Sequence, residues 1–329
     1  MTARIGLAVD GGNSKTDLAL VGDDGALLAL VRGGGSSPHN LGTRQAFDVL
    51  DALFRRARAE ARVETPLEVA RLFLSGVDFP VEVTQATAEA EGRGWARSTT
   101  VDNDTFAILR AGAERGWGIA VVCGAGINCV GVSPDGRHAR FPALGWLTGD
   151  FGGGQDLGTE AVSAAARSED GRGPRTTLER AVPAHFGLGT PGELGEAIHF
   201  GRIPAARVVE LAPIVLAEAA DDPVAASIRD RLAAEVVTLV RVALERLQLD
   251  SEPVEIVLGG GLFQSRDAGL LAAVSAGIGE LAPLAVVRDS ALPPVFGAAF
   301  AALDALDAPA EAYVRLRERA APATEMIGG

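Results

Sequence analysis

Two stretches of the chain alternate short apolar runs with turns rich in glycine. The first has apolar runs at residues 5–9, 18–21 and 26–31, and the second repeats this arrangement over residues 118–137. Apolar runs of this length between glycine turns are typical of antiparallel strands joined in a meander. We therefore predict that a strand meander opens each of two domains.

Helices and further strands are expected between and after the two meanders. Residues 44–62 show an amphipathic helical pattern, whose apolar face is made by Phe47, Leu50, Leu53 and Phe54. Strands are expected at 69–76, 98–104, 254–261 and 284–287, and helices at 105–113, 174–185, 205–220, 227–247 and 293–306. Alternating strands and helices predict an α/β fold.

The length of 329 residues exceeds what one compact core usually accommodates, so two domains are expected. We place the N-terminal domain at residues 1–112, joined by the helix near residues 293–306. The C-terminal domain is placed at residues 113–329.

The composition argues against several classes of protein. A net charge of −13 and an isoelectric point near 4.8 are unfavourable for a nucleic-acid or anionic-membrane surface. No apolar stretch approaches the roughly 18–20 residues of a membrane helix, and no signal peptide is evident, so a cytoplasmic protein is expected. The two cysteines, Cys123 and Cys129, are too few for a disulfide framework or a four-ligand zinc site.

The turn after the first strand has the composition of a phosphate-binding loop. Backbone N–H groups and small hydroxyls bind phosphate oxygens, and glycine lets the backbone approach closely. Asp10, at the strand end, would hold Mg²⁺ through water. An ordinary hairpin with a polar tip is the alternative interpretation. The candidate phosphate-binding residues are Gly11, Gly12, Asn13, Ser14, Lys15 and Thr16, and Lys15 is the only lysine in the chain.

Two common nucleotide-binding motifs do not fit this turn. A Rossmann domain or a P-loop would place a helix directly after the glycines, whereas here an apolar strand pattern resumes. The P-loop pattern also needs a glycine where Ser14 precedes Lys15. The second meander carries a comparable turn, in which Gly124, Ala125 and Gly126 offer backbone N–H groups for a second phosphate site.

These motifs, in this order, resemble the actin-like ATPase superfamily of sugar kinases, heat-shock proteins and actin. The segment at residues 143–158 is most similar to the N-acetylglucosamine kinases, since it fits their Gly-Trp-x-x-Gly-Asp-x-Gly run. That group and the BadF/BadG/BcrA/BcrD ATPases form one family. The resemblance implies two ribonuclease H-like domains with ATP bound in the cleft between them.

The resemblance also implies roles for individual residues. The Asn-Asp pair at the end of the strand over 98–104 resembles the catalytic segment of sugar kinases, which places the general base on Asp104. Asp102 is the competing candidate, and a helix N-cap at Asp104 is the structural alternative. Gly259, Gly260 and Gly261 resemble the adenosine motif.

The acceptor sugar is expected to contact Asp104 and two loops. Asp150 would bind sugar hydroxyls, with Gly145 bringing the backbone close to the sugar. Trp146 is expected to pack in the core rather than stack on the sugar. In the loop at 33–42 the spacing does not align cleanly with the family, and Asn40 is preferred over Ser37 and His39. The second phosphate turn departs from the family because Ala125 replaces a threonine; Asn128 is a candidate replacement for its hydroxyl.

The leading hypothesis is an ATP- and Mg²⁺-dependent N-acetylglucosamine kinase that phosphorylates the 6-hydroxyl. Glucosamine, N-acetylmuramic acid and glucose are alternative acceptors. The activator ATPases of the same family are a second class, but they hold an iron–sulfur cluster on cysteines at a dimer interface. A nucleotide-binding scaffold without chemistry is a third. Dimers are common in this family, so a homodimer is one possible state.

Overall fold

The computed structural model describes residues 4–64, 66–290 and 292–327, without the side chains of residues 321 and 324–327. It divides into two compact units. The first unit comprises Met1–Ala120 and Ser290–Gly329, and the second comprises Val121–Asp289. The expected domain boundary at residue 112 lies eight residues earlier, and the segment that returns to the first unit is longer than the expected 293–306.

The first unit is built on a mixed five-stranded sheet. Strands β1, β2 and β3 form the expected antiparallel meander, whereas β4 and β5 run parallel to β1. Parallel neighbours need crossover connections, and the intervening helices provide them. The order across the sheet is β3 (Leu27–Gly34), β2 (Lys15–Gly22), β1 (Ile5–Gly11), β4 (Leu67–Leu74) and β5 (Ala96–Asn103).

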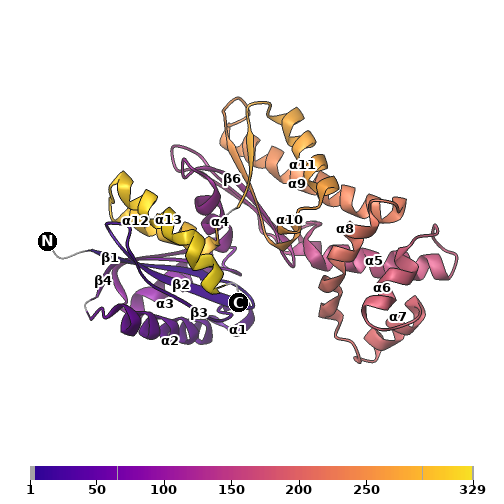
Figure 1. Cartoon of the computed structure of the whole chain (residues 1–329), viewed down its shortest axis with the longest axis horizontal. Helices are drawn as coiled ribbons and strands as arrows, with labels where there is room; N and C mark the ends of the chain where they lie inside the picture. Colours follow the sequence, from indigo (N-terminus) through magenta and orange to yellow (C-terminus); the bar gives the residue numbers. More distant parts are fainter. Residues whose placement is uncertain (1–3, 65, 291, 328–329) are drawn as a thin grey trace. The chain divides into compact units, whose positions relative to one another are not determined.

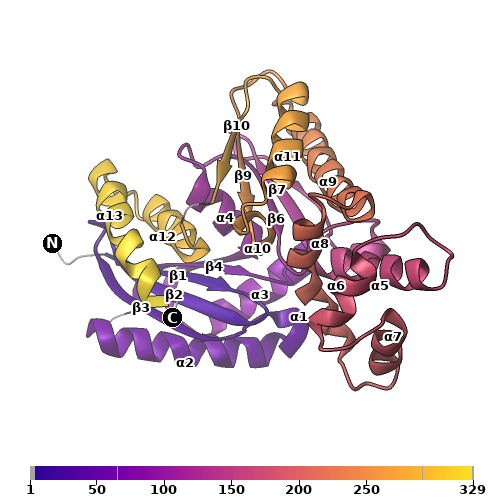
Figure 2. The same ribbon diagram turned by 45° about the vertical axis from the view of Figure 1, so that its right-hand side comes forward.

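Helices cover both faces of this sheet. Successive strand residues point to opposite sides, and apolar residues on both sides need to be buried. Leu7 and Val9 belong to the core beneath α2 (Thr43–Ala61) and α3 (Pro80–Gly92). Ala8 belongs to the core beneath α12 (Pro294–Ala305) and α13 (Ala310–Ile327). In Figures 1 and 2, α12 and α13 lie on the opposite side of the first sheet from α2.

Helix α4 (Asp104–Gly112) packs closely against α12 in the first unit. A Cβ atom at Gly297 would lie 1.9 Å from the carbonyl oxygen of Ala107, so only glycine allows this approach. Residues from the far end of the sequence thereby fix the helix that follows β5. The short helix α1 (Pro38–Leu41) lies between β3 and α2.

The second unit repeats the strand order of the first. Strand β6 takes the place of β1, and β7 and β8 complete a second meander. The parallel pair β9 and β10 occupies the places of β4 and β5. The order is β10 (Val286–Asp289), β9 (Glu255–Gly259), β6 (Gly118–Cys123), β7 (Ile127–Val132) and β8 (His138–Arg140).

Helices of the second unit differ from the expectation at several points: α6 begins at Leu178 and not at residue 174, α5, α7 and α11 were not expected, and two other differences have a local cause. The segment expected to be one helix at 205–220 is a 3-10 helix followed by α8, because Pro213 has no N–H to continue the preceding turn. Helix α9 begins earlier than expected, at Pro223, because Asp222 caps it. The helices are α5 (Gly153–Glu169), α6 (Leu178–His185), α7 (Pro191–His199), α8 (Ala212–Glu218), α9 (Pro223–Leu247), α10 (Gly261–Gln264) and α11 (Ala268–Leu281), with 3-10 turns η1 (Gly145–Leu147) and η2 (Ala205–Leu211).

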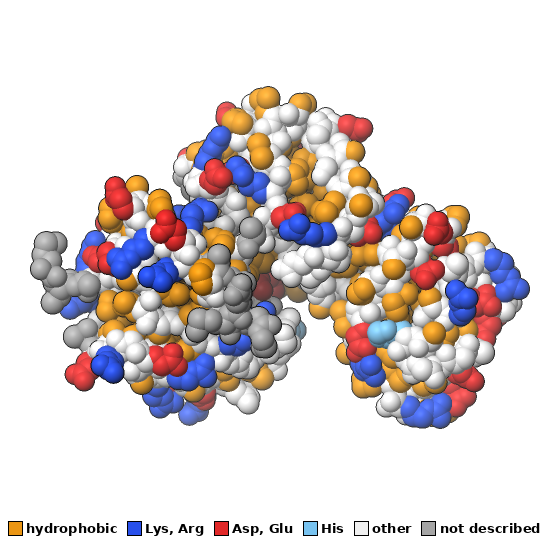
Figure 3. Space-filling model, viewed as in Figure 1, with side chains coloured by type: hydrophobic (Ala, Val, Ile, Leu, Met, Phe, Trp, Pro, Cys, Tyr) orange, Lys and Arg blue, Asp and Glu red, His pale blue; other side chains and the backbone are white. Residues whose placement is uncertain are grey.

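Charged side chains of both signs are mixed over the face drawn in Figure 3. Many arginines on the surface are paired with carboxylates, as Arg93 is with Asp48 and Glu89. Over the described part of the chain, no helix combines the length and apolar character that spanning a membrane requires.

Candidate active site

Three parallel strands of the first unit end at the same edge of the sheet. Gly11 pairs with Leu74, and Leu74 pairs with Asn103, so the carboxyl ends of β1, β4 and β5 form one row. In open α/β sheets, ligands bind beyond the carboxyl ends of the parallel strands. Asp10 and Asp104, the two principal acids predicted from sequence, both lie at this edge.

The first phosphate turn connects β1 to β2 and packs tightly against its neighbours. The N–H of Gly12 donates to the carbonyl oxygen of Lys15 over 2.9 Å, which closes the hairpin. A Cβ atom at Gly11 would lie 2.5 Å from the side chains of Leu74 and Ser36. Thr16 is buried, and its hydroxyl donates to Ser36 Oγ over 2.7 Å. Of the predicted contact residues, Asn13, Ser14 and Lys15 are exposed and Gly12 is partly buried, whereas Gly11 and Thr16 are buried. The hydroxyl of Thr16 therefore supports the turn from within.

The predicted acceptor loop meets this turn. Asn40 in α1 donates from Nδ2 to Asn13 Oδ1 over 2.9 Å, and Ser75 Oγ approaches the same oxygen at 3.4 Å. Asn40 and His39 are exposed, whereas Ser37 is buried and its Oγ has no hydrogen-bond partner among the described residues. The structure thus brings Asn40 next to the predicted phosphate turn.

Asp10 lies in a row of charged side chains across β1, β2 and β3. It pairs with Asp17, and Asp17 pairs with Arg32, so the three side chains share one face of the sheet. Arg32 holds the buried Asp17 through two hydrogen bonds of 2.7 and 2.8 Å. The pKa of Asp10 is raised to about 8, mainly by burial and also by the charges of Asp104 and Asp17, while Lys15 and Arg32 lower it.

This crowding of carboxylates fits a divalent cation. A cation next to Asp10 would relieve the repulsion that raises its pKa. The structure forms no cluster of three or more His, Cys, Asp or Glu side chains that could enclose a metal, as far as its described residues go. Mg²⁺ is commonly held by one or two carboxylates together with water and substrate phosphates, so Asp10 is a suitable ligand.

Asp104 is the first residue of α4, and its carboxylate is not the cap of that helix. Asn103 is the N-cap: its Oδ1 accepts the N–H of Thr105 over 2.9 Å. The interpretation of Asp104 as an N-cap is therefore wrong. The pKa of Asp104 is raised to about 7, mainly by burial and also by the charge of Asp78, while hydrogen bonds from the backbone N–H groups of Thr105 and Asp104 itself lower it. Asp102, the competing candidate, accepts the N–H of Asn103 over 2.8 Å.

Asp78 is a residue of this edge that the sequence prediction missed. It follows β4, and its Oδ1 accepts a hydrogen bond from Asn103 Nδ2 over 2.8 Å. It carries no motif of its own. Its position could have identified it, because Asp78 lies in the loop after β4, as Asp10 lies at the end of β1 and Asp104 directly follows β5.

The second phosphate turn, residues 124–126, is exposed and rests on the start of α5. The N–H groups of Gly154 and Gln155 donate to the carbonyl oxygens of Gly124 and Ala125 over 2.8 and 2.9 Å. Gly153 has a φ of +75°, and a Cβ atom there would lie 2.4 Å from the carbonyl oxygen of Gly126. Gly153 thus allows the first N–H groups of α5 to bind the carbonyl oxygens of the turn.

Two neighbours of this turn bear on the sequence predictions. Asn128 Oδ1 accepts the N–H of Cys129 over 2.7 Å, so that oxygen is already engaged within β7. Gly260 has a φ of +91°, and a Cβ atom there would lie 2.4 Å from the carbonyl oxygen of Cys123. Packing against β6 accounts for Gly260, whereas Gly261 is exposed with open space beside it.

The loop at residues 145–150 folds around the carboxylate of Asp150. Asp150 Oδ2 accepts the N–H of Gly145 over 3.1 Å and a hydrogen bond from Thr148. Gly145 and Gly149 have φ values of +61° and +83°, which let the chain turn around this carboxylate. Trp146 is 85% exposed, so the expectation that it packs in the core is wrong. The tight loop directs its side chain outwards.

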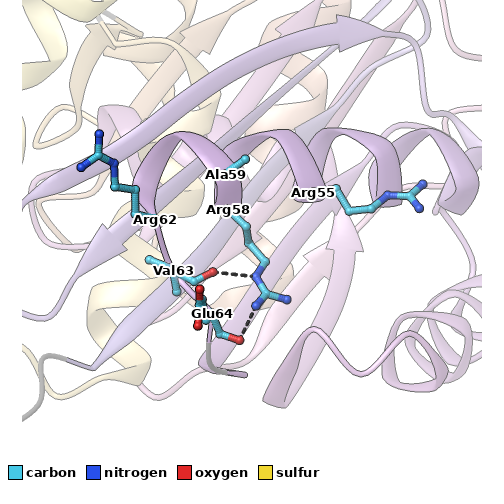
Figure 4. A pocket seen from close by; sticks show the side chains of 6 residues that line it. All are labelled: Arg55, Arg58, Ala59, Arg62, Val63 and Glu64. Atoms are coloured by element: carbon cyan, nitrogen blue, oxygen red, sulfur yellow. Dashed lines mark hydrogen bonds between the residues drawn. The ribbon is translucent and has the colours of Figure 1, made fainter.

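A surface pocket of the first unit lies away from these residues. Figure 4 shows it at the C-terminal end of α2; Arg58 lies between Arg55 and Arg62, whose side chains point in opposite directions along the helix. Arg58 Nε donates to the carbonyl oxygen of Val63 over 2.9 Å, and Arg58 also donates to that of Glu64, so it ties the segment after α2 to the last turn of the helix. This end of α2 leads into the start of β4, at the edge of the sheet opposite Asp10 and Asp104.

Comparisons with known proteins extend over most of the chain. An N-acetylmuramic acid/N-acetylglucosamine kinase from Clostridium acetobutylicum is 26% identical over 262 residues, 79% of this chain and 85% of that protein. An N-acetyl-D-glucosamine kinase from Dictyostelium discoideum is 24% identical over 318 residues, 92% of this chain and 99% of that protein. The crystal structure of a proposed N-acetylglucosamine kinase from Chromobacterium violaceum has 26% identity and a TM-score of 0.70, covering 90% of this chain and 98% of that chain.

The similarity to that crystal structure and the repeated sheet order confirm the expected fold class, α/β with two ribonuclease H-like (actin-like) domains. Residues 7–302 match the sequence profile of one family, described as the BadF/BadG/BcrA/BcrD ATPase family. The match includes both meanders and the strand ends that carry Asp10, Asp78 and Asp104. The chain belongs to the BadF/BadG/BcrA/BcrD ATPase family.

Proposed function

We propose that this protein is an ATP-dependent amino-sugar kinase that transfers the γ-phosphoryl group to the 6-hydroxyl of N-acetylglucosamine. The names of the two curated relatives support this acceptor. The Clostridium relative also carries N-acetylmuramic acid in its name, which makes that sugar the second acceptor to test.

The observation that carries the proposal is the arrangement of Asp104. Asn103 supplies the N-cap of α4, so the helix does not need the Asp104 carboxylate as its cap; that carboxylate receives hydrogen bonds from the backbone N–H groups of Thr105 and Asp104 itself. Its pKa, raised to about 7, matches a group that takes up and releases a proton near neutrality. Asp10 lies at the same edge of the sheet, where a nucleotide phosphate and its metal would be held.

The residues of the chain then divide the chemistry as follows. Asp104 accepts the proton of the 6-hydroxyl as that oxygen forms a bond to the γ-phosphorus, and the bond from the γ-phosphorus to the bridging oxygen breaks to release ADP. Asp10 would hold Mg²⁺, which supplies positive charge to the phosphates when bound. The turns at 11–16 and 124–126 donate backbone N–H groups to the triphosphate, and Gly259, Gly260 and Gly261 border the adenosine.

The residues that we propose to bind the acceptor are Asn40, Asp104, Gly145 and Asp150. The carboxylates of Asp104 and Asp150 accept hydrogen bonds from sugar hydroxyls. Exclusion of water around the acceptor favours transfer to sugar over hydrolysis.

The activator ATPases of the same family are the second candidate function. They require cysteines at a surface shared by two subunits to hold an iron–sulfur cluster. Here Cys123 and Cys129 are 0% and 1% exposed, and burial raises the pKa of both thiols. Buried, protonated thiols are poor cluster ligands, which favours the kinase.

Replacing Asp104 by asparagine tests the proposal, with Asp102→Asn as the matched control. Loss of a general base typically lowers kcat about 10²- to 10⁴-fold. We expect Asp104→Asn to show this loss in sugar-dependent ADP release, with the Kd for ATP changed less than about twofold because phosphate contacts are retained. Asp102→Asn should keep most of the activity. The reverse pattern would move the base to Asp102.

A further inference from the structure

Asp78 occupies a fixed position in the loop between β4 and α3. Its backbone N–H and that of Phe79 each donate to Glu82 Oε2 over 2.9 Å, which ties the loop to the first turn of α3. Its side chain reaches across the sheet edge to Asn103 Nδ2 at 2.8 Å. The backbone and the carboxylate of Asp78 are therefore both held.

Asn103 is 5% exposed and uses both ends of its amide. Its Oδ1 caps α4 at Thr105, and its Nδ2 donates to Asp78. Serine or aspartate would cap a helix as well as asparagine does. What asparagine adds is a donor on the same rigid plane as the capping oxygen, and Asp78 is the acceptor for it.

Asp78 also lies close enough to Asp104 for its charge to raise the pKa of that carboxyl. The two acids stand on either side of Asn103. A displacement of the Asn103 amide would move the first turn of α4 and with it the Asp104 carboxylate. Displacements of about 1 Å near reacting groups can cost about 10²-fold in rate.

We propose that Asp78 is a positioning residue for phosphoryl transfer: by holding the Asn103 amide it fixes the start of α4, and so the orientation of Asp104. This inference rests on the proposed kinase function. It predicts an effect on kcat rather than on binding, because Asp78 acts on the base through Asn103 and not on a substrate.

Three single variants separate the hydrogen bond from other effects of Asp78. Asp78→Ala removes the acceptor, and we expect kcat to fall about 10- to 100-fold with the KM for ATP and sugar changed less than about threefold. Asp78→Asn keeps an acceptor oxygen and should retain most of kcat. Asn103→Ser keeps a capping oxygen but loses the donor to Asp78, so it should match Asp78→Ala.

A double-mutant cycle then tests whether the effect passes through Asn103. In an Asn103→Ser background, adding Asp78→Ala should change kcat by less than about twofold, because the bond is already lost. Full activity of Asn103→Ser, or an undiminished effect of Asp78→Ala in that background, overturns the proposal. So does loss of activity in Asp78→Asn. Should Asp78→Ala fail to fold, Asn103→Ser alone still decides between the outcomes.

Failure of this inference is distinguishable from failure of the kinase proposal. The wild-type protein must first release ADP in a sugar-dependent manner, and Asp104→Asn must lose that activity. If both hold and the Asp78 variants behave as wild type, only the positioning role is rejected.

Discussion

Asp10 should destabilise the protein when no metal is bound, and replacing it by asparagine should therefore raise the melting temperature. Its pKa is raised from the usual 3.8 to about 8 by burial and by neighbouring acids. A group whose folded pKa is raised contributes stability at low pH that is lost as the pH rises through the folded value. The loss runs from about pH 4 to pH 8 and is complete above it.

The size of the effect follows from the shift. Without any correction for solvent, a rise of about 4 pKa units lowers the free energy of unfolding by about 5 kcal/mol above pH 8. Asp10 is half-buried, and solvent screening reduces the expected value to about 2 kcal/mol. For a protein unit of this size, about 2 kcal/mol corresponds to a melting temperature higher by about 5 °C.

Calorimetric melting of wild type and Asp10→Asn in EDTA measures the difference directly. The stability gained by the variant should increase between pH 6 and 8 and stay constant above pH 8.5. Asp102→Asn is the control for loss of a carboxylate in the same row of the sheet. Addition of Mg²⁺ and ADP should stabilise only the wild type, so that the wild type then melts at a higher temperature than Asp10→Asn. A wild type that is more stable than Asp10→Asn in EDTA at pH 8.5 would refute the account of this site.

Two further predictions concern pH and packing. The kcat/KM of the wild type should rise with pH up to about 7 and then level off, because Asp104 must lose its proton to act as a base and its pKa is about 7; a profile that is flat from pH 5.5 to 8, measured by ADP release, contradicts this. Gly260→Ala should lower the melting temperature by several degrees, because its Cβ would lie 2.4 Å from the Cys123 carbonyl oxygen at a φ of +91°. Gly261→Ala, at an open position, is the control and should melt at the wild-type temperature. Equal melting temperatures of the two variants would contradict this prediction.

The meanders and the principal acids could be predicted because their signals are local. Strand-like apolar runs on both sides of a glycine turn predict a hairpin, and both hairpins occur where the pattern placed them. The amphipathic stretch at 44–62 likewise gave α2, with Phe47 and Leu50 fully buried. Asp104 was singled out because an Asn-Asp pair at a strand end resembles the catalytic segment of sugar kinases, and the structure places it directly after β5.

The relations between distant residues could not be predicted in the same way. Asp78 becomes part of the site only because β4 lies between β1 and β5, which no local pattern encodes. Trp146 was expected in the core because large aromatic residues usually are buried, but the glycines beside it turn its loop outwards. Some of the signals that were missed are local. The capping box of Thr190 and Glu193 marks the start of α7, and the N-cap Asp222 marks the start of α9.

The central claim is tested most directly by coupled ADP release from ATP and Mg²⁺ with N-acetylglucosamine, N-acetylmuramic acid, N-acetylmannosamine, glucosamine and glucose. The account predicts ADP release that depends on an amino sugar, fastest with N-acetylglucosamine, gives a 6-phosphate product and disappears in Asp104→Asn. ADP release at the same rate with and without any sugar, or an Asp104→Asn variant with undiminished sugar phosphorylation, would contradict it.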